Sequence, residues 1–253
     1  MHFDTSTIRD LVVVLVPMIL SLSIHEFSHA WSAHLLGDDT AKSQGRMTMN
    51  PLAHIDVFGT LLIPAFSVIA GGIGLIGWAK PVPVSPHRFG RSVTMRTGMM
   101  LTALAGPASN VVLALLVAGV AMFLFSGVLG NLAAHPGIGN RTTALMILGD
   151  RKFLEDNALL LAGMGFGRTQ GVVALLLGRI FLMNVGLAVF NMLPVPPLDG
   201  SRLLPLDMQE KLARYSMIVF IGFIVVINLA GGVLWVPVSI VGNGLLGLWS
   251  FVF

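Results

Sequence analysis

His25, Glu26 and His29 form an HExxH motif, in which two histidines stand four residues apart and a glutamate follows the first of them. On a helix, residues i and i+4 lie on one face, so both imidazoles can bind a single metal ion. A carboxylate beside them can take a proton from a water molecule that the ion activates, which is the arrangement of zinc peptidases. The motif therefore predicts a hydrolytic zinc site with His25 and His29 as ligands and Glu26 as the general base.

The segment that carries this motif is apolar enough to enter a lipid bilayer. Residues 11–20 contain no charged side chain, and about 20 mostly apolar residues are enough to cross once. Of the 253 residues, 55% are hydrophobic and 11% are charged, whereas roughly a quarter are charged in soluble domains. We therefore expect a multi-pass integral membrane protein that hydrolyses peptide bonds at membrane depth.

The composition also excludes several classes of function. Cysteine is absent, which excludes disulfides and thiolate ligands, so histidine and carboxylate side chains must hold any zinc. The net charge of +3 fits loop arginines near lipid headgroups, and no Lys/Arg stripe with interleaved aromatics indicates nucleic-acid binding. The first ten residues lack a basic n-region, so we expect the first apolar stretch to be retained.

Long apolar segments predict the fold class, which is an all-α polytopic membrane protein with about five to six transmembrane helices. We expect one membrane-embedded peptidase domain over 1–253, with a catalytic core at about 8–205 and C-terminal spans at about 214–252. The segment 57–77 is doubtful as a span because Pro64 and four glycines in its second half interrupt it. Irregular backbone is tolerated at membrane depth only where protein or a water-filled cavity covers it. We therefore expect a re-entrant or β-hairpin element near 57–84. The apolar segments lie near 8–36, 57–77, 97–127, 180–198, 214–230 and 232–252.

A catalytic zinc site needs a third protein ligand. His34 follows His29 by five residues and faces elsewhere, about 140° further round an ideal helix. Glu155 and Glu210 lie in polar segments. Asp199 follows three prolines within four residues, which must break the helix, and a carboxylate at the end of a membrane segment is a functional candidate. Leu-Asp-Gly by itself also fits a plain turn, but together with HExxH it predicts Asp199 as the third ligand.

The predicted ligands constrain the topology. His25 lies in the second half of its span and Asp199 at the end of another, so both spans must run in the same direction to reach one ion. This requires 57–77 to re-enter rather than to cross. It also places nine Lys/Arg residues on the side of the site and six on the other, which predicts a site near the cytoplasmic face. The nine are Lys42, Arg46, Lys80, Arg88, Arg91, Arg96, Arg202, Lys211 and Arg214, and the six are Arg9, Arg141, Arg151, Lys152, Arg168 and Arg179.

The chain resembles the site-2 protease family of intramembrane zinc metalloproteases. That family pairs HExxH in one transmembrane helix with a later N-x-x-P-x-x-x-x-D-G-type motif, which stands here from Asn191 to Gly200. Residues 50–56, 77–83 and 105–110 further resemble the compact bacterial and archaeal branch. The resemblance covers roughly residues 10–205, and we see no segment for a PDZ or CBS domain.

The resemblance implies that His25, His29 and Asp199 bind one Zn²⁺ per chain, and that Glu26 acts as base and then as proton donor. It implies that Asn191 helps to bind the substrate or the oxyanion, with His54 near the metal as a further candidate. Asn191 also fits a cap on the broken helix, and His54 a loop residue that orders the start of the hairpin. Residues 105–110 are most simply a close packing site of small residues.

The predicted function is intramembrane proteolysis of a transmembrane protein or peptide, in a prokaryotic cell membrane and near its cytoplasmic face. A helical substrate must unwind before attack, and residues 80–84 can hold the unwound strand by β-addition. A membrane di-iron oxidase is a weaker reading because it requires several histidine boxes. The other alternative is a non-proteolytic zinc protein, either a transporter or a pseudoprotease scaffold, and Glu26 disfavours the scaffold. Substrate identity, prior cleavage by another protease, gating and oligomeric state stay open.

Overall fold

A computed structural model of the chain describes residues 5–69, 77–134, 154, 156, 158–163, 165–216, 218–220, 222 and 235–249. Across these residues the secondary structure is helical, without a β-strand, in agreement with the predicted all-α class. The number of transmembrane helices and the element near 57–84 stay predictions. The elements are α1 (Thr5–Leu35), α2 (Thr40–Ser43), η1 (Pro51–Ala53), η2 (Val57–Leu62), α3 (Ile63–Ile69), η3 (Pro86–Arg88), α4 (Met95–Ala133), α7 (Ala158–Gly163), α8 (Arg168–Asn191), η4 (Asp199–Leu203), α9 (Leu206–Ala213) and α11 (Trp235–Trp249).

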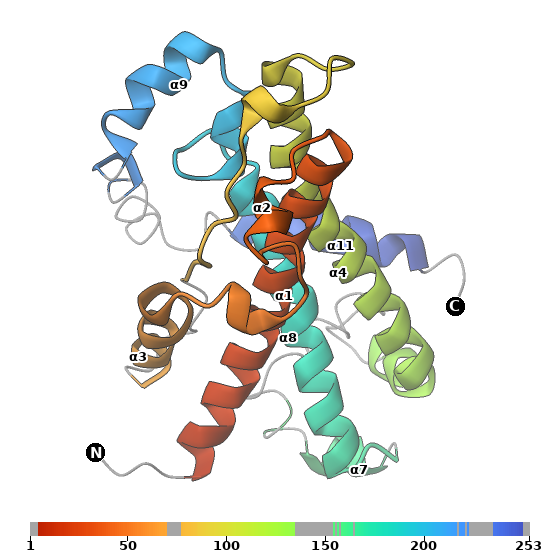
Figure 1. The fold of residues 1–253 in the computed structure, drawn as a ribbon. Coiled ribbons are helices and arrows are strands. Elements are labelled where there is room, and N and C mark those ends of the chain that lie inside the picture. Colours follow the sequence, from red (N-terminus) through yellow and green to blue (C-terminus); the bar gives the residue numbers. More distant parts are fainter. Residues whose placement is uncertain are drawn as a thin grey trace.

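Three long helices form the centre of the protein (Figure 1). Segments of α1, α4 and α8, namely Thr7–Leu35, Met95–Val128 and Thr169–Asn191, are long and apolar enough to cross a membrane. In Figure 1, α1 and α8 run in the same direction and α4 runs against them. Large apolar side chains such as Val12 and Leu116 are exposed on the helices, as expected for surfaces that face lipid.

Small residues let these helices approach one another closely. Ala114, Ala118 and Ala121 of α4 are buried in a core with Phe181 and Val185 of α8. Side chains of α11 complete this core, and the Trp249 indole N–H donates to the Leu115 carbonyl oxygen at 3.0 Å. Alanine at a helix contact brings two backbones together and strengthens their van der Waals packing. The core therefore fixes α4 against α8, the two helices on either side of the candidate site.

Helix α8 differs in its bounds from the predicted span at 180–198. It begins earlier, at Arg168, and ends at Asn191. Pro194 restricts the residue before it to extended conformations, and Pro196 and Pro197 follow at once, so the chain cannot continue as a helix. The irregular segment 192–198 then leads into η4, which begins at Asp199. The prolines thus turn the chain back toward α1, so that the Asp199 carboxylate contacts that helix.

The connection between α1 and α4 begins and ends at the same end of the helix bundle. The Gly90 N–H donates to the Leu36 carbonyl oxygen at 2.8 Å, and the Ser85 N–H donates to Asp38 Oδ2 at 2.6 Å. Between these ties, the apolar stretch near 57–77 forms the short helical run η2–α3, and residues 70–76 lie outside the described residues. Most of the predicted C-terminal spans at 214–252 lies outside them too, apart from α11 and a few residues before it.

Residues 78–85, which we call the strap, run in an irregular extended course from the α3 region toward η3. The N–H groups of Trp78 and Lys80 donate to the carbonyl oxygens of Gly59 at 3.2 Å and of His54 at 2.9 Å. Arg46 Nη2 donates to the Lys80 carbonyl oxygen at 2.7 Å. These hydrogen bonds tie the strap to the preceding part of the connection, and the Val82 N–H ties it to Glu26 of α1.

Candidate metal centre

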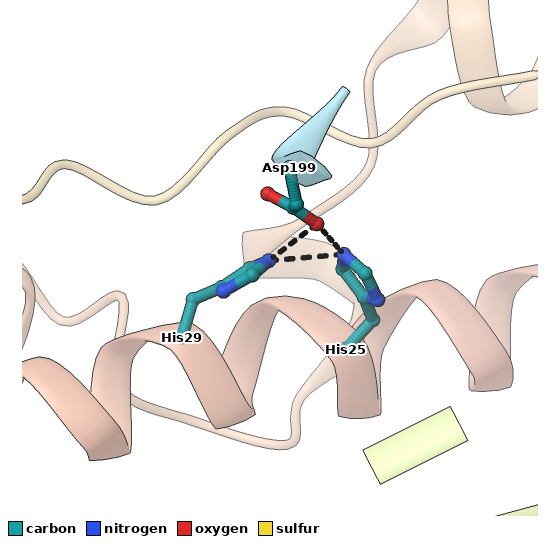
Figure 2. A group of neighbouring side chains, drawn as sticks. All are labelled: His25, His29 and Asp199. Atoms are coloured by element: carbon teal, nitrogen blue, oxygen red, sulfur yellow. Dashed lines mark hydrogen bonds and ion pairs between the residues drawn. The ribbon is translucent and has the colours of Figure 1, made fainter. Parts of the chain in front are cut away.

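Two histidines of α1 and one aspartate of η4 meet at a single point (Figure 2). His25 Nε2 and His29 Nε2 lie 3.0 Å apart, because four residues make about one helical turn. Asp199 Oδ2 lies 3.1 Å from His25 Nε2 and 3.2 Å from His29 Nε2. Both imidazoles are buried. The structure thus brings the three predicted ligands together as a group that could hold a metal ion.

The hydrogen bonds of the two imidazoles show that this group suits a cation. His25 Nδ1 donates to Asn110 Oδ1 at 2.6 Å, and His29 Nδ1 donates to the Thr102 carbonyl oxygen at 2.7 Å. Both partners are acceptors, so in the neutral rings each Nδ1 carries the hydrogen and each Nε2 presents a lone pair. Two lone pairs and a carboxylate oxygen therefore converge on one point, where they repel one another unless a positive charge lies between them.

The spacing of the three atoms fits zinc. Tetrahedral ligands at about 2.0–2.1 Å from Zn²⁺ lie roughly 3.3 Å from one another, and the three distances here are 3.0, 3.1 and 3.2 Å. Nitrogen and carboxylate ligands in this number are those of catalytic zinc sites, which keep a fourth position for water or substrate. The donor set and its geometry therefore fit a catalytic zinc ion.

Glu26 is positioned beside the ligands by the strap. It follows His25 on α1, and its Oε2 accepts a hydrogen bond from the Val82 N–H at 2.9 Å. A hydrogen bond to an ionised group is shorter and roughly twice as strong as a neutral one. The contact thus holds the carboxylate of the residue that follows the ligand His25.

Helix α4 contributes two residues of the segment 105–110, for which the sequence most simply predicts close helix packing. A Cβ atom at Gly106 would lie 2.4 Å from His29 Nε2 and 2.6 Å from His25 Cε1, so only glycine fits there. Asn110, one turn further along, bonds His25. Their spacing of four residues places both on one helix face, but the sequence gives no signal that this face meets the histidines.

The other two predicted site residues lie as follows. Asn191 is the last residue of α8 and is partly buried. His54 is buried, its Nε2–H donates to the Thr48 carbonyl oxygen at 2.8 Å, and its own carbonyl oxygen accepts from the strap at Lys80. His54 is not among the ligand atoms that converge on the candidate metal position.

Comparison with known proteins gives one family. A model described as Peptidase family M50 matches residues 13–229. Over 247 residues the chain is 32% identical to "Putative zinc metalloprotease YwhC" of Bacillus subtilis (strain 168), which covers 95% of this chain and 92% of the relative.

Two further relatives carry the name "Putative zinc metalloprotease Rip2". The one from Mycolicibacterium smegmatis is 36% identical over 109 residues, which are 43% of this chain and 39% of the relative. The one from Mycobacterium tuberculosis (strain Erdman) is 28% identical over 203 residues, which are 80% of this chain and 60% of the relative. No solved structure matches the chain.

Proposed function

Because the chain belongs to Peptidase family M50, the site-2 protease family, we propose that it is a zinc endopeptidase that cleaves a peptide bond within or near the transmembrane segment of a membrane protein. One observation carries this proposal. His25, His29 and Asp199 converge within hydrogen-bonding distance of one another, and both histidines stand on a helix that is long and apolar enough to cross a membrane. Glu26 stands beside them as the base.

Each residue of this site would have its own role in hydrolysis. Bound zinc would polarise the scissile carbonyl and bring the pKa of a water molecule toward ~7. Glu26 would take the proton from the attacking water and return it to the leaving nitrogen. Asn191, at the end of α8, would donate to the substrate or to the developing oxyanion. His54 would contribute indirectly, because its carbonyl oxygen accepts the hydrogen bond that holds the strap at Lys80.

The topology of residues 36–94 supports a re-entrant element. Because Leu36 and Gly90 are hydrogen-bonded to each other, this connection begins and ends at the same end of the bundle, which favours re-entry of 57–77 over a full crossing. The Lys/Arg asymmetry then favours a site near the cytoplasmic face. The relatives are bacterial proteins, and a prokaryotic cell membrane is the proposed location.

The strap is the proposed docking edge for the unwound substrate. The N–H groups of Trp78 and Lys80 donate to carbonyl oxygens of the preceding connection, and the Val82 N–H donates to Glu26 of α1, whereas Pro81 and Pro83 have no N–H. Over residues 80–84 every N–H thus belongs to Lys80, Val82 or Val84. A substrate strand needs donors as well as acceptors to pair along an edge, and the N–H groups of Lys80 and Val82 already donate within the chain. A substrate that pairs with the strap would therefore replace Glu26 at the Val82 N–H or use the N–H of Val84.

The test is zinc content and cleavage of a tagged single-span substrate by the purified full chain in detergent. Wild type is compared with Glu26→Gln and Asp199→Ala. We expect cleavage to be lost in both variants, with zinc retained in Glu26→Gln and depleted in Asp199→Ala. Zinc binding without cleavage of any of a panel of single-span substrates would favour the transporter or scaffold. A well-folded wild type that binds no zinc would overturn the proposal.

A further inference from the structure

A chain of buried hydrogen bonds leads from the candidate metal position into the middle of the helix bundle. His25 Nδ1 donates to Asn110 Oδ1 at 2.6 Å, and Asn110 Nδ2 donates to Asn184 Oδ1 at 2.7 Å. Asn184 Nδ2 in turn donates to Ser21 Oγ at 2.8 Å and to the Ile180 carbonyl oxygen at 2.7 Å. Ser21, Asn110 and Asn184 have no exposed surface, and they come one each from α1, α4 and α8.

The far end of this chain fixes its direction. A carbonyl oxygen can only accept, so the Ile180 carbonyl requires the NH₂ of Asn184 to face it. Asn184 Oδ1 must then face Asn110, which turns the NH₂ of Asn110 toward Asn184 and its Oδ1 toward His25. An acceptor at that position requires the hydrogen of His25 on Nδ1, and the Nε2 lone pair is left for the metal.

We propose that Asn110 and Asn184, which we call the amide relay, are positioning residues that hold His25 in the tautomer and ring orientation in which Nε2 binds zinc. His29 obtains the same tautomer from a backbone carbonyl oxygen, that of Thr102. The relay provides the same function for His25 through side chains, and it ties this ligand to α4 and α8. This inference rests on the zinc site of the proposed function.

Substitutions at the relay distinguish positioning from packing. Asn110→Leu keeps the approximate volume but removes the acceptor, whereas Asn110→Asp keeps an acceptor for His25 Nδ1. Partners of this kind typically contribute 10–100-fold in metal affinity. A pure packing role would make the carboxylate the worse substitution, because a buried charge is more harmful than leucine. If Asn110 is a positioning residue, Asn110→Asp should instead bind zinc more tightly than Asn110→Leu.

The experiment measures zinc dissociation constants by competition with a chromophoric chelator, together with visible absorption spectra of the Co²⁺-substituted chain. We expect Asn110→Leu to bind zinc roughly 10–100-fold more weakly than wild type and to show an altered Co²⁺ spectrum. Asn110→Asp should lie closer to wild type, and Asn184→Leu should lose less affinity than Asn110→Leu. Ser109→Ala is the matched control on the same helix, since the Ser109 hydroxyl donates to the Gly106 carbonyl oxygen of its own helix.

Wild-type zinc affinity and Co²⁺ spectrum in Asn110→Leu would overturn the inference, and so would weaker zinc binding by Asn110→Asp than by Asn110→Leu. If Asn110→Leu does not fold, Asn184→Leu carries the test, and wild-type behaviour in it refutes the relay. Neither readout requires a substrate. A wild type that binds zinc but cleaves nothing therefore refutes the protease and leaves the relay standing, whereas a cleaving enzyme with unaffected variants refutes the relay alone.

Discussion

Gly106→Ala tests whether α4 shapes the metal site or only packs beside it. Gly106 is buried against the two ligand imidazoles. A methyl group there would lie 2.4 Å from His29 Nε2, 2.5 Å from His29 Cε1 and 2.6 Å from His25 Cε1. Ordinary van der Waals contact begins at about 3.4 Å, so one methyl group meets both ligands at once.

The displacement needed is large on the scale of metal coordination. Relieving the contact with His29 requires a shift of about 1 Å, whereas ligand distances in a metal site stay within about 0.2 Å of their normal values. A misplacement of 1 Å at a catalytic group can lower the rate about 100-fold. We expect Gly106→Ala to bind zinc at least about 10-fold more weakly and to cleave about 100-fold more slowly.

Two other glycines of α4 provide matched controls. At Gly127 a Cβ atom meets nothing within 4 Å, so Gly127→Ala should keep zinc affinity and stabilise the helix by roughly 0.5–1 kcal/mol. At Gly119 a Cβ atom would lie 2.6 Å from Trp249 Cζ2, so Gly119→Ala should lower the melting temperature and leave zinc affinity unchanged. Wild-type zinc affinity and cleavage in Gly106→Ala would refute the account of this contact.

Two further predictions concern the strap. Val82→Pro removes the N–H that binds Glu26 and should lower kcat roughly 10- to 100-fold with zinc retained. An equal loss of kcat in Val84→Pro would instead indicate that the strap pairs with the substrate. No loss of kcat in either variant would exclude both roles. Burial alone would raise the pKa of Asp38, but hydrogen bonds from the Ser85 N–H and from Thr40 hold it below its ordinary value. This contribution to stability is present above the unfolded pKa of about 3.9 and is lost as the pH falls below it. Thermal unfolding between pH 6 and pH 3 should therefore show a smaller acid-induced loss in Asp38→Asn than in wild type, and equal losses would contradict the assignment.

The histidine pair and the end of the helix before Asp199 followed from sequence because both are local features. Two histidines four residues apart on a helix must share a face, and three prolines before Asp199 must end the preceding helix. Whether Asp199 can contact the histidines depends on how α8 packs against α1, and the spacing of residues in the sequence does not predict that packing. The structure supplies that step with distances of 3.1 and 3.2 Å.

The roles of Gly106 and Asn110 did not follow from sequence because they depend on how two helices face each other. A glycine and an asparagine one turn apart fit a close packing site equally well. What distinguishes the site is the partner, since the imidazoles of α1 face Gly106 and Asn110. The rotation of α4 about its own axis determines which of its residues face α1. An apolar helix has weak hydrophobic periodicity, so this rotation is hard to predict from sequence.

The polar groups around the site include a fully buried cluster and two partly buried carboxylates. Ser21 lies one turn before His25 on α1, and with Asn110 and Asn184 it forms a hydrogen-bonded cluster without exposed surface. Polar groups in an apolar bundle are stable only when paired, so this cluster closes the site on the inner side. Asp199 keeps 17% of its side chain exposed, and Glu26 is only partly buried beneath the strap. Among the residues that the structure describes, Asp199 and Glu26 are therefore groups of the site that are only partly buried, and the Val82 N–H of the strap binds one of them.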